Sequence, residues 1–232
     1  MPVLLLELAA PWQAWGSDSR FLRRATEPLP TKSGVIGLLA AAEGRRRTDP
    51  IADLVELRFG VRCDQTGVAQ NDFHTATNWE TGKSKPLTNR AYLADARFLA
   101  ALEGQRLVLE GLAASLRNPV FPLYLGRRAC APSGRLVRGI RDMELDMALR
   151  EEPWLAKDWY RRRQPTTVSL PVSRDARPDE AADERLHDVP LSFDPRRREY
   201  SWRSVRHEWV TVDNPTGVDP RAHEPMALLG GV

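Results

Sequence analysis

The feature that most constrains the fold is a long polar stretch between Asp64 and Asn89. It consists mainly of Asp, Gln, Thr, Asn, Gly, Lys and His, with few large apolar side chains. It is too polar to form a core and too long for an ordinary connection between two elements. Long insertions of this kind are typically functional or mobile. The core must therefore come from the apolar segments on either side.

Three segments before the insertion predict a strand, a helix and a second strand. Residues 3–9 are a compact apolar run bounded by Pro11, which favours a strand buried on both faces or nearly so. A helix is expected to begin at Ser33, a good N-cap residue, and to end at Gly44, because apolar side chains form one stripe between them. Residues 57–63 alternate apolar and polar side chains, as a half-buried strand does.

The segments after the insertion predict a further strand and a helix. Residues 91–102 fit helix and strand patterns equally well, so periodicity leaves their structure open. Residues 105–117 are typical of an amphipathic helix ended by Asn118. The side chains expected to face the core are Leu107, Val108, Leu112 and Leu116. Another strand is expected near residues 120–125.

This order of elements predicts an α+β fold of the ferredoxin-like (RRM) type, in which two helices pack on an antiparallel sheet. We expect residues 1–130 to form this domain, with the polar stretch inserted into it. Residues 131–232 are rich in Arg, Pro and Asp with isolated aromatic residues, which predicts a less regular C-terminal region. One or two late strands are expected there, within residues 199–212.

Positive charge is concentrated in one part of the chain. The 34 basic and 31 acidic residues give a net charge of only +3, but the stretch from Arg20 to Arg47 has seven basic residues against two acidic ones. The basic residues are Arg20, Arg23, Arg24, Lys32, Arg45, Arg46 and Arg47. Arginine can fork onto phosphate oxygens, and the helix starting at Ser33 offers free N–H groups beside Lys32. The alternative is that these arginines solvate a loop and that Thr31 merely caps the helix.

The polar insertion carries aromatic side chains among flexible residues. Those of interest are Phe73, His74, Trp79 and Asn89, with Lys83 and Lys85 near the end of the insertion. Aromatic rings in such a segment can stack on unpaired bases. The alternative is that Phe73 and Trp79 fold back onto the body as anchors.

A glycine followed by two arginines, at residues 126–128, offers a third candidate. Gly126 would allow a ligand to approach the backbone, with the guanidinium groups of Arg127 and Arg128 beside it. A turn with exposed arginines explains the segment nearly as well.

Catalytic and metal-binding patterns are not recognisable. The four histidines are scattered, and no Walker, GxSxG, HExxH or GxGxxG pattern occurs. Cys63 and Cys130 are single and far apart, so we expect no metal, no cofactor and no disulfide, as in a reducing cytoplasm. The apolar opening is too short for a signal peptide or a membrane span.

Several motifs occur in the order found in one known family. They are WGSDSRFLRRATEPLPTKSGVIGLL at 15–39, VRCD at 61–64, DFHT at 72–75, AYLADARF at 91–98 and PLYLGRRAC at 122–130. The chain thereby resembles the fifth family of CRISPR-associated (Cas) proteins, in the form that serves as the CasD subunit of type I-E Cascade. The resemblance covers roughly the first 130 residues and continues more loosely to His207 and Trp209.

The resemblance implies a ferredoxin-like body with a β-hairpin thumb over about residues 64–89, and a strand at 91–102. It implies a non-catalytic subunit that holds the 5′ handle of the CRISPR RNA and caps one end of the complex. The thumb would touch a backbone subunit. A large subunit would be a second protein partner, and target DNA would be reached through the complex.

The resemblance also suggests RNA-binding residues. Lys32, Ser33 and Gly34 match the family's Lys/Arg-Ser-Gly loop beside the handle, and Arg127 and Arg128 match its Gly-Arg-Arg segment. The full set of candidates is Arg20, Arg23, Arg24, Lys32, Ser33, Gly34, Arg45, Arg46, Phe73, His74, Trp79, Arg127 and Arg128.

One departure from the family pattern concerns catalysis. Relatives of another subtype that cut repeat RNA use a tyrosine and an adjacent Lys-His pair, and this sequence has no Lys-His dipeptide. The alternative function is a metal-independent endoribonuclease that processes CRISPR repeat RNA. It would need a base for the 2′-hydroxyl proton, and His74 or His207 with a nearby Arg would be the candidates.

Overall fold

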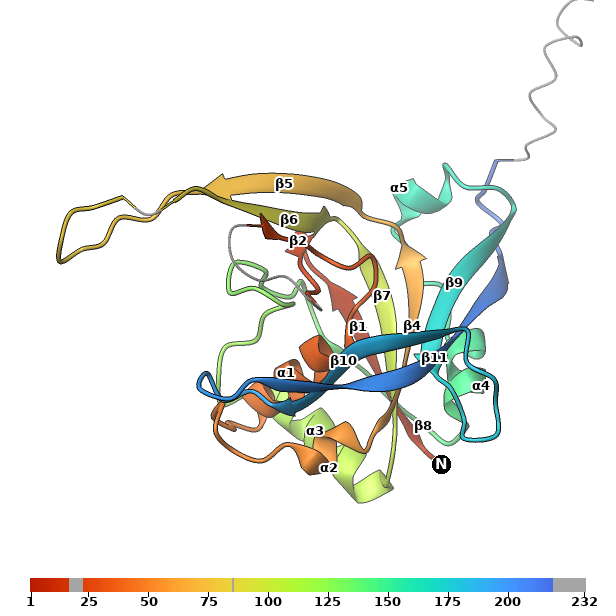
Figure 1. Ribbon diagram of the computed structural model, residues 1–232. Coiled ribbons are helices and arrows are strands. Elements are labelled where there is room, and N and C mark those ends of the chain that lie inside the picture. Colours follow the sequence, from red (N-terminus) through yellow and green to blue (C-terminus); the bar gives the residue numbers. More distant parts are fainter. Residues whose placement is uncertain (17–22, 85, 219–232) are drawn as a thin grey trace, which may run out of the picture.

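A computed structural model describes residues 1–16, 23–84 and 86–218 (Figure 1). The strands are β1 (Val3–Ala9), β2 (Trp12–Gln13), β3 (Arg23–Arg24), β4 (Arg58–Gln65), β5 (Val68–His74), β6 (Thr88–Ala94), β7 (Arg97–Glu103), β8 (Val137–Arg141), β9 (Thr167–Asp175), β10 (Glu184–Ser192) and β11 (Glu199–Asp213). The helices are α1 (Lys32–Ala42), α2 (Ala52–Val55), α3 (Arg106–Arg117), α4 (Leu145–Glu151) and α5 (Asp158–Arg161). None of the helices within these described ranges is long and apolar enough to cross a membrane.

A seven-stranded sheet with the order β10-β11-β9-β4-β7-β1-β8 forms the body of the protein. All its neighbouring strands are antiparallel. Helix α1 connects β1 to β4, and α3 connects β7 to β8. The sheet curls, so that β10 and β11 pass in front of the other strands and β10 packs against α1 and α2 (Figure 1). The protein is thus a mixed α/β structure with a curled antiparallel sheet.

Strand β1 is buried on both faces, as its apolar run predicted. Leu4, Leu6 and Leu8 belong to the larger core cluster, which also contains the inner sides of α1 and α3. Val3 and Leu5 point to the opposite face and belong to a second cluster with side chains of α4. Because successive side chains of a strand point to opposite faces, a strand between two helical layers must be apolar throughout.

A buried ion pair fastens α4 to its face of the sheet. Arg62 and Asp64 on β4 are fully buried, and Arg62 Nε donates to Asp64 Oδ1 (2.7 Å) while Nη2 donates to Oδ2 (2.8 Å). Arg62 Nη1 also donates to the carbonyl oxygens of Leu149 (2.6 Å) and Glu152 (2.8 Å). The backbone N–H of Leu155 donates to Asp64 Oδ2 (2.6 Å). The segment VRCD therefore has a structural explanation.

The polar insertion forms a β-hairpin that projects from the body (Figure 1). Strands β5 and β6 pair antiparallel from Val68 with Ala94 to His74 with Thr88. Residues 91–102, which periodicity left open, are divided between β6 and β7. Asp95, between these strands, has a positive φ of 55°.

The expected strand at 120–125 is wrong. The backbone N–H groups of Val120 and Phe121 instead donate to the carbonyl oxygens of Ala42 (3.0 Å) and Ala41 (3.2 Å), at the C-terminal end of α1. Helix ends leave carbonyl groups without intrahelical partners, and this segment satisfies two of them. The strand that follows α3 is β8.

The inward face of α3 also differs from the expectation. Leu112 and Leu116 are buried as predicted, but Leu107 is 81% exposed. Val108 is 37% exposed as well. The buried stripe is Leu109, Leu112, Ala113 and Leu116, which has the spacing of one helical face.

The C-terminal region is more regular than its composition suggested. The late strand expected within 199–212 is confirmed as β11, and β9 and β10 pair with the same sheet. The expected boundary near residue 130 does not coincide with a break in the sheet, because β8 pairs with β1 and β9 pairs with β4.

We predict that Arg62→Ala lowers the free energy of unfolding by about 3–5 kcal/mol, because it leaves the Asp64 carboxylate buried without its cation. The measurement is urea-induced unfolding followed by circular dichroism. Arg117→Ala, on the exposed end of α3, is the matched control and should change stability by less than about 0.5 kcal/mol. Equal stability of the two variants would contradict the role given to the ion pair.

Candidate nucleic-acid interface

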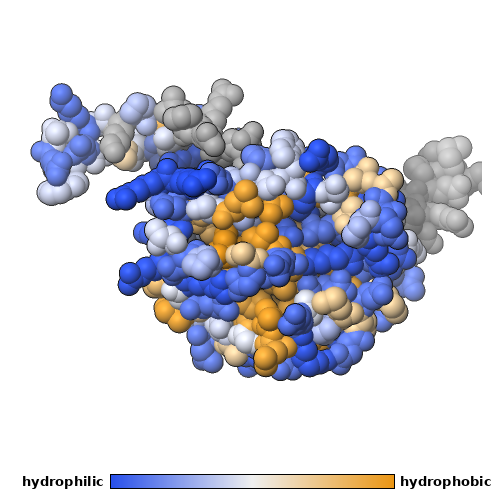
Figure 2. Space-filling model, turned by 60° about the horizontal axis from the view of Figure 1, so that its bottom comes forward, coloured by the Kyte–Doolittle hydropathy of each residue, from blue (hydrophilic) through white to orange (hydrophobic). Residues whose placement is uncertain are grey.

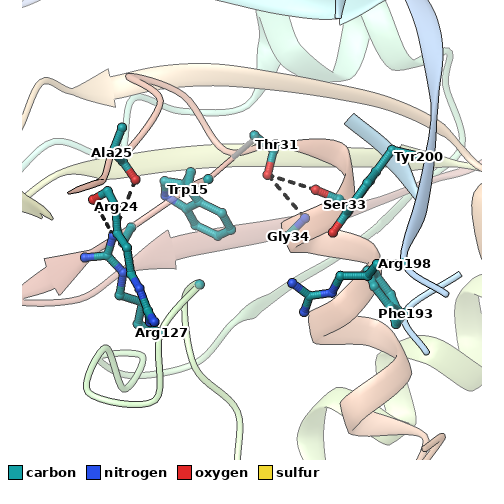
Figure 3. A pocket seen from close by; sticks show the side chains of 13 residues that line it. Trp15, Arg24, Ala25, Thr31, Ser33, Gly34, Arg127, Phe193, Arg198 and Tyr200 are labelled. Atoms are coloured by element: carbon teal, nitrogen blue, oxygen red, sulfur yellow. Dashed lines mark hydrogen bonds between the residues drawn. The ribbon is translucent and has the colours of Figure 1, made fainter. Parts of the chain in front are cut away.

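A cavity of about 300 Å³ lies where four parts of the chain meet (Figure 3). Two of them are the segment after β2 and the segment around β3, the third is the start of α1 together with the turn at Gly126, which are close in space, and the last is the connection from β10 to β11 with the start of β11. The lining residues are Ala14, Trp15, Gly16, Arg24, Ala25, Thr31, Ser33, Gly34, Gly126, Arg127, Phe193, Arg198 and Tyr200. The sequence analysis named Arg24, Ser33, Gly34 and Arg127 among them.

The N-terminal end of α1 forms one wall of the cavity. Thr31 is the N-cap, and its Oγ1 accepts a hydrogen bond from the backbone N–H of Gly34 (3.3 Å) and one from Ser33 Oγ (3.4 Å). The helix has eleven residues and no acidic side chain in its first turn. Its aligned peptide dipoles place their positive end at this wall, where the Asp188 carboxylate accepts a hydrogen bond from the backbone N–H of Lys32 (2.8 Å).

Three arginines and no carboxylate are among the described residues that line the cavity. Arg127 is already engaged: its guanidinium donates to the carbonyl oxygens of Ala91 (2.8 Å) and Arg24 (2.8 Å) and lies 4.5 Å from the centre of the Tyr92 ring. Arg127 thus holds the wall in shape. The side chains of Arg24 and Arg198 are exposed and have no partner among the described residues, so both can bind an anion.

Two glycines are required where the walls come together. A Cβ atom on Gly34 would lie 2.7 Å from Trp15 Cε3, and the Trp15 ring is only 1% exposed. Gly126 has a φ of +89°, and a Cβ atom there would lie 1.6 Å from the carbonyl oxygen of Ala14. Both contacts are shorter than any side chain permits.

Lys32 does not offer a free cation, contrary to the expectation. It is 6% exposed, and its Nζ lies 2.9 Å from Asp175 Oδ2 while its backbone N–H donates to Asp188 Oδ2 (2.8 Å). Arg203 on β11 pairs with Asp188 (2.6 Å) and with Asp175 (2.7 Å). Burial alone would lower the pKa of Arg203, but the two carboxylates raise it. We call these four residues the buried charge network.

The other candidates from the basic stretch lie outside the cavity lining. Arg45 pairs with Glu43 (2.7 Å) and donates to Asp53 Oδ1 (2.6 Å), so its charge serves the local structure. Arg46 follows the C-terminal end of α1 and is exposed. Arg128 is exposed beside the lining residue Arg127.

Two further candidates are described only in part or not at all. Arg23 is in β3, paired with Asn89 of β6, and its side chain is not described. Arg20 lies outside the described residues.

The aromatic residues of the hairpin point into solvent. Phe73 is 69% exposed and Trp79 is 89% exposed, so the interpretation that they anchor the insertion to the body is wrong. His74 Nε2 lies 2.6 Å from Asp72 Oδ2. Asn78 closes the tip, since its Oδ1 accepts hydrogen bonds from the N–H of Glu80 (2.9 Å). The space-filling view shows the tip as mostly hydrophilic (Figure 2).

The sequence reasoning missed Trp15, Phe193, Arg198 and Tyr200 as lining residues. Trp15 was part of a recognised motif, but a tryptophan in a motif does not by itself indicate that the ring lines a cavity. Arg198 belongs to a run of three arginines between two aromatic residues, and that combination was the available signal.

The cysteines and acidic residues do not form a recognisable centre. Cys63 and Cys130 are both free and buried, and burial raises the pKa of the Cys63 thiol to about 11. Within residues 1–16, 23–84 and 86–218, no three His, Cys, Asp or Glu side chains are grouped as metal ligands would be.

The comparison with protein families gives the decisive match. The family described as CRISPR-associated protein (Cas_Cas5) matches residues 3–206, a range that includes every residue lining the cavity. The chain belongs to the Cas5 family. It is 36% identical over 149 residues to the CRISPR system Cascade subunit CasD of Escherichia coli (strain K12), a match that covers 55% of this chain and 66% of that protein.

Solved structures extend the similarity over nearly the whole chain. A structure described as a CRISPR RNA-guided surveillance complex contains a chain that is 34% identical, with a TM-score of 0.73, and the match covers 98% of both chains. The crystal structure of a Cas protein is 37% identical with a TM-score of 0.71, and the match covers 94% of this chain and 98% of that one. The curled sheet is therefore the fold of this Cas5 family member and its relatives.

We predict that Gly126→Ala lowers the free energy of unfolding by about 1–3 kcal/mol more than Gly134→Ala does. Both glycines have a positive φ, so both variants carry similar backbone strain, but nothing lies within 4 Å of a Cβ atom at Gly134. Thermal and urea unfolding measure the difference. If the two variants were equally stable, the close approach of Gly126 to Ala14 would be unimportant.

Proposed function

We propose that this Cas5 protein is a non-catalytic, cytoplasmic subunit of a Cascade-type surveillance complex. It binds the 5′ handle of the CRISPR RNA and caps one end of the complex. The observation that carries the proposal is the cavity at the start of α1, which has three arginines and no carboxylate among its described lining residues. The similarity to CasD and to a chain of a CRISPR RNA-guided complex supports it.

We further propose that β8, β1, β7 and β4, with α1 and α3, are a ferredoxin-like (RRM-type) body. Their order in the sheet and their helical crossovers support this interpretation. An RRM stacks bases on the open face of its sheet. Here α4 packs against β1, β4 and β7, and its side chains share a buried cluster with Leu5 and Leu99. RNA is therefore bound at the cavity rather than on the sheet face.

The chemistry of the cavity suits one nucleotide unit of a single-stranded nucleic acid. The side chains of Arg24 and Arg198, which have no partner among the described residues, can fork onto phosphate oxygens, and the dipole of α1 has its positive end at the cavity. Tyr200 contributes aromatic surface. A volume of about 300 Å³ is at the lower end for small-molecule sites, which fits a single nucleotide unit rather than a duplex.

The lining favours binding over RNA cleavage. Cleavage through the 2′-hydroxyl needs a general base within hydrogen-bond reach. The described lining residues include no His, Lys, Asp or Glu. His74 lies on the hairpin beside Asp72, and His207 lies 3.0 Å from Glu184 on the neighbouring strand, so neither candidate base is at the cavity.

The hairpin provides a separate surface for protein partners. Its exposed Phe73 and Trp79 are on an element that projects from the body. Exposed aromatic residues of this kind are typical anchors of protein interfaces. We propose that the hairpin contacts a backbone subunit of the complex and that a large subunit binds elsewhere on the protein. Target DNA is then reached through the complex.

We predict that the double variant Arg24→Glu, Arg198→Glu weakens binding of single-stranded handle RNA at low salt and flattens its salt dependence. Each lost phosphate contact lowers the slope of log K against log salt by about 0.7 for single strands. Fluorescence anisotropy over a salt series measures both effects. Arg117→Glu makes the same kind of charge change on the exposed end of α3 and should leave the slope nearly unchanged. Unaltered binding by the double variant would remove the cavity from the RNA site.

We predict that replacing residues 75–87 with Asn-Gly prevents stable assembly with the other subunits but leaves the body folded. His74 and Thr88 are the last pair of the hairpin, so a two-residue turn can close it there. Thermal unfolding and co-elution with the purified partner subunits test this. Trp79→Ala, which removes only one exposed ring, should weaken assembly less. An intact complex with the shortened hairpin would show that the tip is not an assembly surface.

A further inference from the structure

A row of rings runs along the ribbon formed by β10 and β11. The ring of Tyr200 lies 6.2 Å from that of His187, and the His187 ring lies 4.7 Å from the ring of Trp202 at an interplanar angle of 33°. The guanidinium of Arg185 lies 5.8 Å from the Trp202 ring. Aromatic and guanidinium planes at these separations present flat surfaces on which a further ring can stack.

The row begins in the cavity and continues out of it. Tyr200 and Arg198 are lining residues, and Figure 3 shows the Tyr200 side chain beside Ser33. Moving away from the cavity the side chains become accessible: His187 and Arg185 are exposed, and Trp202 is 55% exposed. The rings of His187 and Trp202 are therefore not part of the hydrophobic core.

The charge of the ribbon favours a polyanion. The carboxylates of Asp188 and Glu199 each lie within 3.0 Å of an arginine guanidinium, so they repel an anion little, and Glu184 lies 3.0 Å from His207 Nε2. Arg185 and Arg198, at the two ends of the row, have no hydrogen-bonded or ionic partner among the described residues. Two free cations with aromatic rings between them match single-stranded nucleic acid, whose phosphates and unpaired bases alternate.

We infer that the row Tyr200, His187, Trp202 and Arg185 is a second nucleotide subsite, on which unpaired RNA bases leaving the cavity stack. The inference rests on the proposed function, because the cavity supplies the RNA. Stacking tolerates any base, since every base has a π face. The cavity therefore fixes the position of the RNA strand. The row adds affinity for the neighbouring nucleotides and sets the direction in which the RNA leaves the cavity.

The experiment compares three variants of the full chain by RNA binding. Trp202→Ala removes the stacking surface, Trp202→Phe retains a ring, and Trp209→Ala removes another exposed tryptophan of β11 that makes no ring or cation contact among the described residues. The probe is labelled single-stranded handle RNA with one abasic nucleotide placed at each position in turn. Thermal unfolding checks that each variant is folded.

The expected result is that Trp202→Ala weakens binding of intact RNA about 5- to 100-fold. Trp202→Phe and Trp209→Ala remain close to wild type, and the slope of the salt dependence is unchanged because no charge is lost. At one or two positions an abasic nucleotide should abolish the difference between wild type and Trp202→Ala.

Two results would overturn the inference, and they differ from each other. If wild type binds the handle and the Arg24→Glu, Arg198→Glu variant does not, while Trp202→Ala binds as wild type, the row is not a subsite but the proposed function stands. If wild type shows no preference for handle RNA, the proposed function fails and the inference fails with it. If Trp202→Ala binds RNA as wild type does but loses a protein partner, the row is likewise not a nucleotide subsite, and the proposed function still stands.

Discussion

The buried charge network of Lys32, Asp175, Asp188 and Arg203 joins the first turn of α1 to strands β9, β10 and β11. These residues come from distant parts of the chain, each charge is paired, and each side chain is at most 14% exposed. Removing one partner of such a pair leaves an unpaired charge in a poorly solvated environment, which costs several kcal/mol of stability. The network therefore fixes the α1 end of the cavity relative to the β10–β11 connection, which supplies Phe193, Arg198 and Tyr200. Without this junction the cavity would lose one of its walls.

Arginines and lysines of this chain have two separate uses. Lys32, Arg62 and Arg203 are buried with carboxylates and carbonyl groups and hold the layers together. Arg24, Arg185 and Arg198 are exposed, and their side chains have no hydrogen-bonded or ionic partner among the described residues, although the Arg185 guanidinium lies 5.8 Å from the centre of the Trp202 ring. A nearly neutral net charge is compatible with RNA binding because carboxylates such as Asp64, Asp175 and Asp188 are paired within the fold, away from the exposed cations. These exposed cations belong to the surface that we propose for RNA binding.

Periodicity predicted the parts of the fold whose side chains repeat locally. The apolar run of β1, the stripe of α1 and the alternation of β4 each identified an element within one or two residues. Strand β9 was missed because Pro171 and several polar residues interrupt its pattern, and β8 because its exposure is mixed. Lys32 was misjudged for another reason: its partner Asp175 lies 143 residues away, and no local pattern shows that pairing. Arg198 and Tyr200 were also missed because they are far in sequence from Thr31 and Arg24. The curl of the sheet brings all four residues to the same cavity. The family resemblance suggested the RNA partner, and the tertiary structure distinguishes exposed cations from those paired with carboxylates.

We propose that the protein retains guide RNA without cutting it. The most direct test incubates the purified protein with labelled repeat RNA in the absence of metal and scores cleavage and retention in one assay. The account predicts retention that disappears when the handle sequence is scrambled, with no product formed. A discrete product cut on the 5′ side of the handle, with turnover, would make the protein a ribonuclease and contradict the account.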